Sequence, residues 1–277
     1  IFISCLLLFV TELILLGLRV AQPNARYTWL AAIGGAMLAL ASVFIWLAQM
    51  PVDLVFPAWQ PLALFQNPIL FRADAVSWPY AISVAGITLT ILLTAVARPN
   101  STSSYAWAGV LALGGLGILA VTANNPFTLL LIWSALDLSE LITQLRSVDG
   151  PKNNEKVVIS FSTRALGTFL LLWANIVSIA QGSSFDFQSI APSSGLYFVA
   201  AAGLRLGVFP LHLPYSSESV LRRGFGTSLR LIAAASSLVL LAHVPAGSLS
   251  SGATPFLLAL AIIAAVYGGW MWLRAPD

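Results

Sequence analysis

Long apolar runs, separated by short polar stretches, follow one another along the chain. A helix that crosses a membrane needs about 20 mostly apolar residues, and nine stretches are long and apolar enough to be such helices. We predict membrane-spanning helices near residues 1–19, 28–49, 76–97, 105–122, 126–146, 157–180, 195–220, 227–244 and 255–273. The seventh is predicted to be discontinuous, because Pro210 lacks an amide hydrogen and its ring clashes with the preceding turn. Residues 51–72 contain four prolines and are predicted to form an interfacial crossing without a helix.

The composition supports this pattern. Hydrophobic residues make up 58% of the chain and charged residues only 8%, whereas a soluble domain carries roughly 25% charged residues. The predicted fold is therefore an all-α, polytopic membrane bundle that forms a single domain over residues 1–277. Residues 1–75 hold the first two helices and the proline-rich loop, and residues 76–277 hold the remaining helices. The small net charge of +3 is typical of basic cytoplasmic loops, so no nucleic-acid partner is expected.

The basic residues collect on one side of the predicted membrane. The segments that end or follow the odd-numbered helices carry Arg19, Arg26, Arg98, Arg146, Lys152, Lys156, Arg222, Arg223 and Arg274. The opposite loops carry a single basic residue, Arg72, ahead of the third helix. Because basic loops stay in the cytoplasm, the arginine-bearing loops are predicted to be cytoplasmic and the N-terminus to lie outside.

A polar face runs along the fifth predicted helix. The spacing i, i+4, i+7, i+11 places four side chains on that face: Trp133, Asp137, Glu140 and Gln144. Carboxylates inside a membrane need a counter-charge or water, and Arg205 on the seventh helix is the predicted partner of Asp137. Two interpretations of this pair remain open: an acid–base pair in an intramembrane water path, or a structural ion pair between two helices.

Other charged or titratable residues lie inside the predicted helices. Arg164 and Arg230 are ion-path candidates: each is predicted to anchor helices to one another or to reach the interface with its long side chain, and the alternative is a part in a proton relay. His212 follows the predicted break, where it could line water and titrate near neutral pH. Glu12 is flanked by apolar residues and is predicted to face either the bundle or a partner subunit. Arg205 is not expected to donate and accept a proton, because arginine stays charged in proteins.

No pattern in the sequence predicts catalysis by this chain. The single cysteine, Cys5, cannot form a disulfide framework or a cysteine-based metal site. The sequence has no GxGxxG element, no nucleophile triad and no metal-ligand cluster. We therefore expect no cofactor, no metal and no catalytic residue of its own. Asp74, three residues before Ser77, is predicted to cap the third helix.

Four segments together carry a family resemblance. The most specific is Arg205-Leu-Gly-Val-Phe-Pro210-Leu-His212 followed by Leu-Pro214. A second, weaker match is Arg72-Ala-Asp74-Ala-Val-Ser77. The fifth helix and the final Trp270-Met-Trp-Leu-Arg274-Ala-Pro-Asp277 add weaker matches. The chain resembles the antiporter-like membrane subunits of respiratory complex I, which are related to Mrp-type sodium/proton antiporters and membrane-bound hydrogenases. In that family the first run reads Lys-x-x-x-x-Pro-x-His-x-Trp-Leu-Pro on a discontinuous seventh helix, and the second reads Arg-x-Asp-x-Leu-Ser.

The chain also departs from this family. The family's seventh-helix lysine falls on Arg205, and its fifth-helix glutamate falls on Ser134 when the helix is aligned by Trp133. Asp137, about one turn further on, is the nearest carboxylate and our preferred acidic group. The eighth-helix lysine or histidine of the family falls near Ser237. The resemblance implies about fourteen helices, of which this chain has nine.

The resemblance implies a subunit that contributes to, or structurally completes, a proton or sodium path in a complex I-type or related redox-coupled assembly. The enzyme would then be the whole assembly, an NADH:quinone oxidoreductase-type translocase. The expected partners are other membrane subunits, lipids, and protons or sodium ions, in an energy-transducing membrane such as the bacterial inner membrane or its organelle equivalent. Two alternatives remain open: a degenerate scaffold subunit without ion transport, and an independent secondary transporter that binds a small solute at the membrane midplane.

Overall fold

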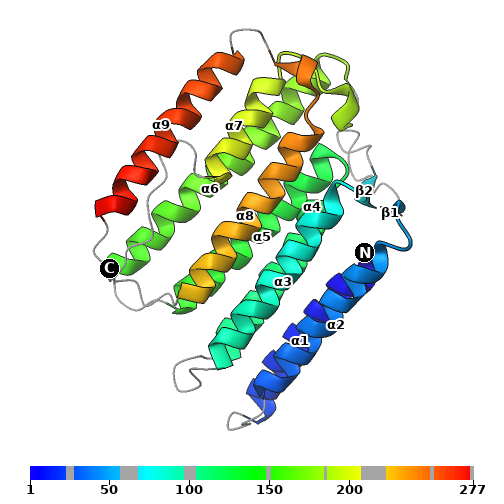
Figure 1. The fold of residues 1–277 in the computed structure, drawn as a ribbon, viewed down its shortest axis with the longest axis vertical. Helices are drawn as coiled ribbons and strands as arrows, with labels where there is room; N and C mark the ends of the chain where they lie inside the picture. The colour runs from blue at the N-terminus through cyan, green and yellow to red at the C-terminus, as the bar shows by residue number, and fades with distance from the viewer. Residues whose placement is uncertain are drawn as a thin grey trace.

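The computed structural model describes residues 1–22, 28–56, 68–96, 104–147, 151–183, 186–206, 223–249 and 253–274. Within these ranges it contains nine α-helices, and it confirms the predicted all-α membrane bundle (Figure 1). The helices are α1 (Phe2–Ala21), α2 (Thr28–Trp46), α3 (Ser77–Val96), α4 (Ser104–Thr122), α5 (Pro126–Ser147), α6 (Pro151–Ala180), α7 (Gly195–Leu206), α8 (Arg223–His243) and α9 (Ala253–Arg274). Two short 3₁₀ helices, η3 (Phe187–Ser189) and η4 (Ala246–Ser248), and two strands, β1 (Val52–Phe56) and β2 (Ile69–Ala73), complete the described elements.

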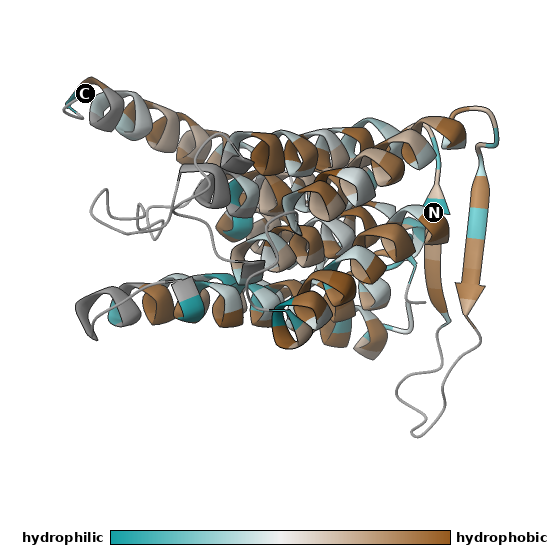
Figure 2. Ribbon diagram, turned by 90° about the horizontal axis from the view of Figure 1, so that it is seen from below, coloured by the Kyte–Doolittle hydropathy of each residue, from teal (hydrophilic) through white to brown (hydrophobic). Residues whose placement is uncertain are grey.

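The helices have the length and the surface of membrane spans. In the described part of the chain, α1 to α6 contain six segments long and apolar enough to cross a membrane, and apolar stretches of α7, α8 and α9 are shorter. Large apolar side chains such as Leu13 and Phe169 are exposed, at 65% and 59%, which suits lipid contact. Figure 2 shows hydrophobic residues along most of the helical ribbons. The chain is therefore an integral membrane protein.

Helix α4 is the centre of the bundle. In its candidate span 78% of residues are buried, against at most 39% in each of the other five, and it packs against α1, α3, α5 and α8. Small residues permit this close packing. A Cβ atom at Gly114 would lie 2.6 Å from Oγ1 of Thr88 on α3, so the two backbones approach too closely for a larger residue there.

Some helix boundaries differ from the predicted ones. Helix α2 ends at Trp46, three residues before the predicted end at residue 49, and α6 begins at Pro151, six residues before the predicted start at residue 157. Proline suits the first turn of a helix, because the amide there has no partner within the helix. The predicted break at Pro210 and the candidate His212 lie outside the described residues.

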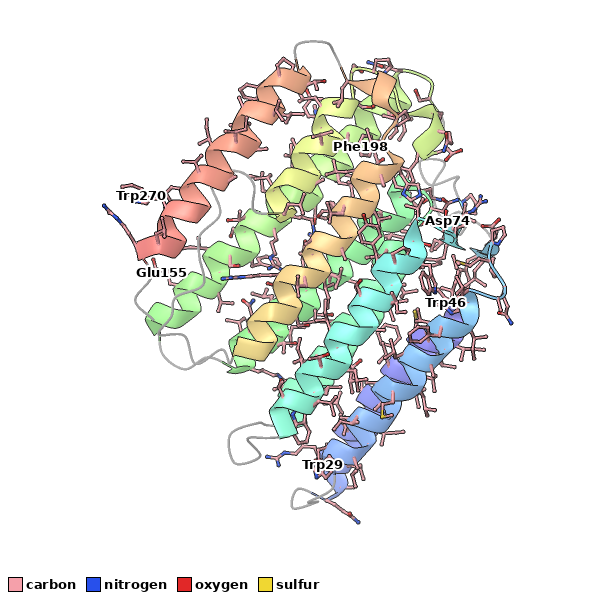
Figure 3. All side chains as sticks on the ribbon, viewed as in Figure 1. Trp29, Trp46, Asp74, Glu155, Phe198 and Trp270 are labelled. Atoms are coloured by element: carbon pink, nitrogen blue, oxygen red, sulfur yellow. The ribbon has the colours of Figure 1, made fainter. Side chains whose placement is uncertain are left out.

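The proline-rich segment contributes two paired strands, a β-hairpin. Strands β1 and β2 pair antiparallel, with Val52 opposite Ala73 and Phe56 opposite Ile69. The described part of residues 51–72 contains no helix, as predicted, but the strands were not expected from the sequence. Figure 3 shows Trp46 and Asp74 at the end of the bundle that carries the hairpin and Trp29 at the opposite end.

Side chains attach this hairpin to the helices. The amide of Leu70 donates to Oγ1 of Thr128 at 2.9 Å. Nδ2 of Asn125 donates to the carbonyl of Pro68 at 2.8 Å, and Oδ1 of Asn125 accepts from the amide of Thr128 at 2.6 Å. Oδ1 of Asp74 accepts from the amide of Ser77 at 2.8 Å, which agrees with its predicted capping role. The α4–α5 connection is thereby joined to β2.

Replacing Asn125 by alanine tests this attachment. The variant removes both hydrogen bonds of a side chain that is 5% exposed, so the free energy of unfolding should fall by about 1–3 kcal/mol. Thermal and denaturant unfolding in detergent would measure the loss. Asn124→Ala is the matched control, because Asn124 contacts Leu70 through its backbone amide. Equal stability of the two variants would contradict the assigned role of Asn125.

Candidate functional site

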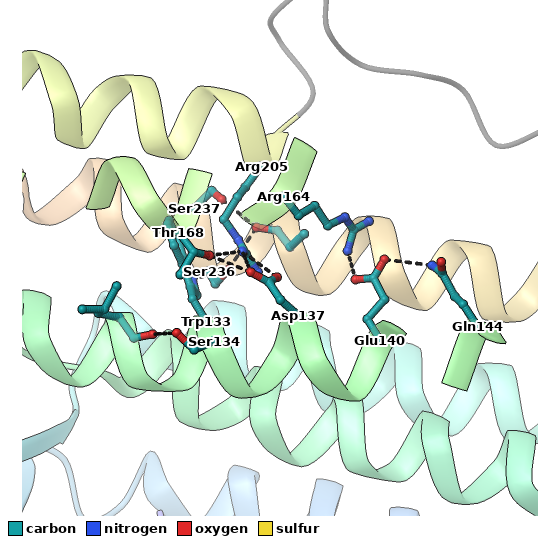
Figure 4. Close-up of polar contacts among 12 residues, drawn as sticks. Trp133, Ser134, Asp137, Glu140, Gln144, Arg164, Thr168, Arg205, Ser236 and Ser237 are labelled. Carbon is teal, nitrogen blue, oxygen red and sulfur yellow. Dashed lines mark hydrogen bonds and ion pairs between the residues drawn. The ribbon is translucent and has the colours of Figure 1, made fainter. Parts of the chain in front are cut away.

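The polar face of α5 meets α6, α7 and α8 inside the bundle (Figure 4). The structure brings Asp137 of α5 and Arg205 of α7 into contact, as the sequence predicts. Nη1 of Arg205 donates to both carboxylate oxygens of Asp137, at 2.7 Å and 2.9 Å. Their side chains are only 1% and 4% exposed. The two opposite charges are thus removed from solvent together.

Thr168 of α6 completes the contact. Its hydroxyl donates to Oδ2 of Asp137 at 2.6 Å and accepts from Nη1 of Arg205 at 2.9 Å. Both Asp137 oxygens therefore accept hydrogen bonds, and three helices share one network. Among the described residues, Nε of Arg205 has no hydrogen-bond acceptor.

Trp133 extends the site to α8. The guanidinium carbon of Arg205 lies 4.4 Å from the centroid of the indole ring, a cation–π contact. The indole N–H donates to Oγ of Ser236 at 3.1 Å, and the Ser236 hydroxyl donates to the carbonyl of Ala233 at 3.0 Å. The fully buried ring thus connects the ion pair to a serine-rich segment of α8.

A second ion pair lies on the same face of α5. Glu140 pairs with Arg164 of α6, and their side chains are 7% and 12% exposed. Nε2 of Gln144 donates to Oε1 of Glu140 at 2.8 Å. Asp137, Glu140, Arg164 and Arg205 together carry no net formal charge. Four charged side chains from α5, α6 and α7 therefore meet at this face as two pairs of opposite charge.

The position of Arg205 places the first pair deep in the bundle. Arg205 lies ten residues after Gly195, where α7 begins, and ten residues of helix rise about 15 Å. This rise is about half of the roughly 30 Å thickness of the hydrocarbon core of a bilayer. Helix α6 makes room for Arg205 at Gly167, where a Cβ atom would be 3.1 Å from Cγ of Arg205.

The remaining predicted residues have other positions. Arg230 is exposed on α8, unlike the buried Arg205. Ser134, the position of the family's glutamate in the tryptophan-based alignment, is exposed and its hydroxyl donates to the carbonyl of Leu130 at 2.9 Å. Ser237 is buried and its hydroxyl donates to the carbonyl of Ala233 at 2.8 Å. Neither serine position supplies a carboxylate, so the acidic groups of the buried face are Asp137 and Glu140.

Sequence reasoning missed three parts of the site: Thr168, Ser236 and the pairing of Glu140 with Arg164. A signal for Thr168 exists, because it lies four residues after Arg164 and therefore on the same face of α6. Ser236 had no comparable signal. Among the described residues, no group of three histidine, cysteine, aspartate or glutamate side chains could hold a metal ion.

The fold and these buried pairs define a helical membrane protein with two ion pairs inside its bundle. No family model matches the sequence, and no curated protein sequence matches it. Among solved structures, a chain of the membrane-bound sulfane sulfur reductase (MBS), an archaeal respiratory membrane complex, is similar with a TM-score of 0.71 and 15% identity over 89% of this chain and 41% of that chain. A chain of the Mrp complex from Dietzia sp. DQ12-45-1b is similar with a TM-score of 0.70 and 18% identity over 86% and 27% of the two chains.

These similarities confirm the predicted resemblance at the level of the fold. The chain has the fold of membrane subunits found in these two kinds of complex, and it spans less than half the length of either matching chain.

Removing Arg205 tests the energetic role of the first pair. Arg205→Ala leaves the buried Asp137 carboxylate without its counter-charge, so the free energy of unfolding should fall by about 3–5 kcal/mol. Unfolding in detergent would measure the loss, with Arg274→Ala at the exposed end of α9 as a control that changes stability by less than about 1 kcal/mol. The double variant Asp137→Leu/Arg205→Met should recover most of the stability, because it removes both charges. An Arg205→Ala variant as stable as the control would contradict the assignment.

Proposed function

We propose that this chain is an antiporter-like membrane subunit of a redox-coupled, ion-translocating complex of the complex I type or a related type. Its buried face on α5 contributes to a proton or sodium path through the membrane arm. The observation that carries this proposal is the buried Asp137–Arg205 contact, shared with Thr168. Intramembrane charges are costly and typically mark ion paths. The fold shared with chains of a respiratory membrane complex and an Mrp complex supports the same class of protein.

The Asp137–Arg205 pair suits one role in such an ion path, that of a fixed charge beside a carboxylate. Arg205 stays charged, so it acts as a fixed positive charge and not as a proton carrier. Asp137 can exchange a proton only when its contact with Arg205 loosens, because both of its oxygens accept hydrogen bonds in the described arrangement. The buried Nε of Arg205 has no acceptor among the described residues. We infer that the pair controls ion passage, because proton exchange at Asp137 depends on its contact with Arg205.

The scaffold interpretation is the second candidate, and one observation favours it. Both carboxylates of the buried face are already paired, Asp137 with Arg205 and Glu140 with Arg164. A face of saturated pairs would join α5, α6 and α7 without moving an ion. The scaffold and the ion path differ in whether transport depends on the Asp137 charge.

The charges at the helix ends support an orientation. Arg19, Arg146 and Arg274 lie in the last turns of α1, α5 and α9, and these turns lie at the same end of the bundle, away from the hairpin (Figure 1). We propose that this end is cytoplasmic, that the hairpin end lies outside, and that the host is an energy-transducing membrane.

Asp137→Asn tests the ion path. In membranes that contain the assembled complex, the variant should lose most redox-coupled ion transport while the subunits still purify together, because the amide has no ionisable proton but keeps the shape. Ser134→Ala, on the exposed side of the same helix, is the matched control and should transport normally. Transport can be followed with a pH-sensitive dye and with a sodium indicator. Normal transport by Asp137→Asn would favour the scaffold.

Purification in mild detergent tests the class of protein. The chain should purify with several other membrane subunits, which mass spectrometry would identify, because its proposed role depends on redox chemistry elsewhere in the complex. Recovery of the chain alone, together with binding of a small solute, would contradict the subunit proposal and favour an independent transporter.

A further inference from the structure

Glu12 of α1 differs from the paired acids of α5. It is partly buried in a membrane-spanning helix whose neighbouring Leu13 is exposed and whose Leu15 is fully buried. No ion pair or hydrogen bond to the Glu12 carboxylate is formed by the described residues. A carboxyl group at this position in a membrane requires a proton, a cation or water as its partner.

Glu12 lines a pocket that can supply such a partner. The pocket lies between α1, α4 and α5 and has a volume of about 180 Å³. This volume can hold several water molecules, since one needs roughly 10–15 Å³ of such space. Ser139 and Thr143 of α5 contribute hydroxyl groups to its wall, and Ala108 and Ala112 of α4 contribute an apolar surface.

The pocket extends to the end of the bundle that carries the basic residues. Arg146, in the last turn of α5, and Tyr105, in the first turn of α4, also line it. The guanidinium carbon of Arg146 lies 5.2 Å from the centroid of the Tyr105 ring. The lining residues thus connect the position of Glu12 with the proposed cytoplasmic end, so water could reach the carboxyl group from that side.

The charged and titratable groups around Glu12 are few. Helix α1 itself carries Cys5 and Arg19, about two turns to either side of Glu12. Helix α4 supplies Tyr105, α5 supplies Arg146, and α2, which packs against α1, has no charged or titratable residue between Thr28 and Trp46. A bare sodium ion would need a shell of oxygen ligands, and one carboxylate, two hydroxyl groups and a nearby arginine are a poor set for it. A proton needs only the carboxylate.

We propose that Glu12 is a proton-binding site, loaded through this pocket from the end of the bundle where α5 ends. The site lies on a different face of α5 from the paired acids, because Ser139 lines the pocket while the adjacent Glu140 faces Arg164. The inference goes beyond the proposed function, since proton binding at Glu12 can be measured without any measurement of transport.

Carbodiimide labelling of the intact complex in native membranes tests this proposal. Dicyclohexylcarbodiimide is apolar and reacts with protonated carboxyl groups, and peptide mapping by mass spectrometry locates the product. Glu12 should be labelled at low pH, and labelling should fall about tenfold per pH unit once the group ionises. Addition of sodium at constant pH should leave the labelling unchanged. No labelling at any pH, or protection by sodium, would overturn the proposal.

Two variants and one internal control sharpen the result. Glu12→Gln should abolish labelling of that peptide, while Glu155, exposed near the start of α6, should still react with a water-soluble carbodiimide. Ser139→Leu fills the pocket with an apolar side chain, and it should slow labelling of Glu12 by a water-soluble carbodiimide relative to the wild-type complex. Unchanged access in Ser139→Leu would show that the reagent arrives by another route and would overturn loading through the pocket.

Discussion

The contact between Asp137 and Arg205 is the constraint on which the interior of this bundle depends. Each charge alone would be unfavourable in the interior of a membrane bundle, and each is stabilised by the other. The residues around this contact are suited to it. Thr168 supplies the hydroxyl that both charged groups use, and Gly167 leaves space for the Arg205 stem. Trp133 covers the guanidinium and connects it to α8. Four helices are therefore positioned by one pair of charges.

The use of arginine rather than lysine has a physical consequence for this site. A lysine in the same place could lose its proton when buried, and the pair would then switch between charged and neutral forms. An arginine keeps its charge, so any change must come from Asp137 or from movement of α7 relative to α5 and α6. The second pair, Glu140 with Arg164, has the same property. The four charges of the buried face thus sum to zero, and the arginines keep their charge. The state of the two pairs is therefore more readily changed by helix movement than by titration of an arginine.

The sequence predicts the helices well because the length of an apolar run and the thickness of a bilayer are directly related. It also predicts that Asp137 and Glu140 share a face, since helical spacing alone decides this. It does not predict the β-hairpin, because β1 and β2 depend on contacts such as that of Leu70 with Thr128, which is 58 residues away along the chain. Ser236 was missed for the same reason: its contact with Trp133 depends on how α8 packs. The spacing of residues along a helix therefore predicts which side chains share a face, but the packing of the helices decides which residues those side chains contact.

Helix α5 lies between two acidic sites: the ion-paired carboxylates on one side and the Glu12 pocket on the other. Towards α6 and α7 it presents Asp137 and Glu140, whose charges are balanced by arginines. Towards α1 it presents Ser139 and Thr143, which line the pocket of Glu12, an acid that forms no ion pair with the described residues. These residues alternate along less than two turns, so a shift or rotation of α5 would change both environments together. If Glu12 exchanges protons with the cytoplasmic side and Asp137 responds to geometry, α5 is the element through which one could influence the other, without a continuous chain of hydrogen bonds between them.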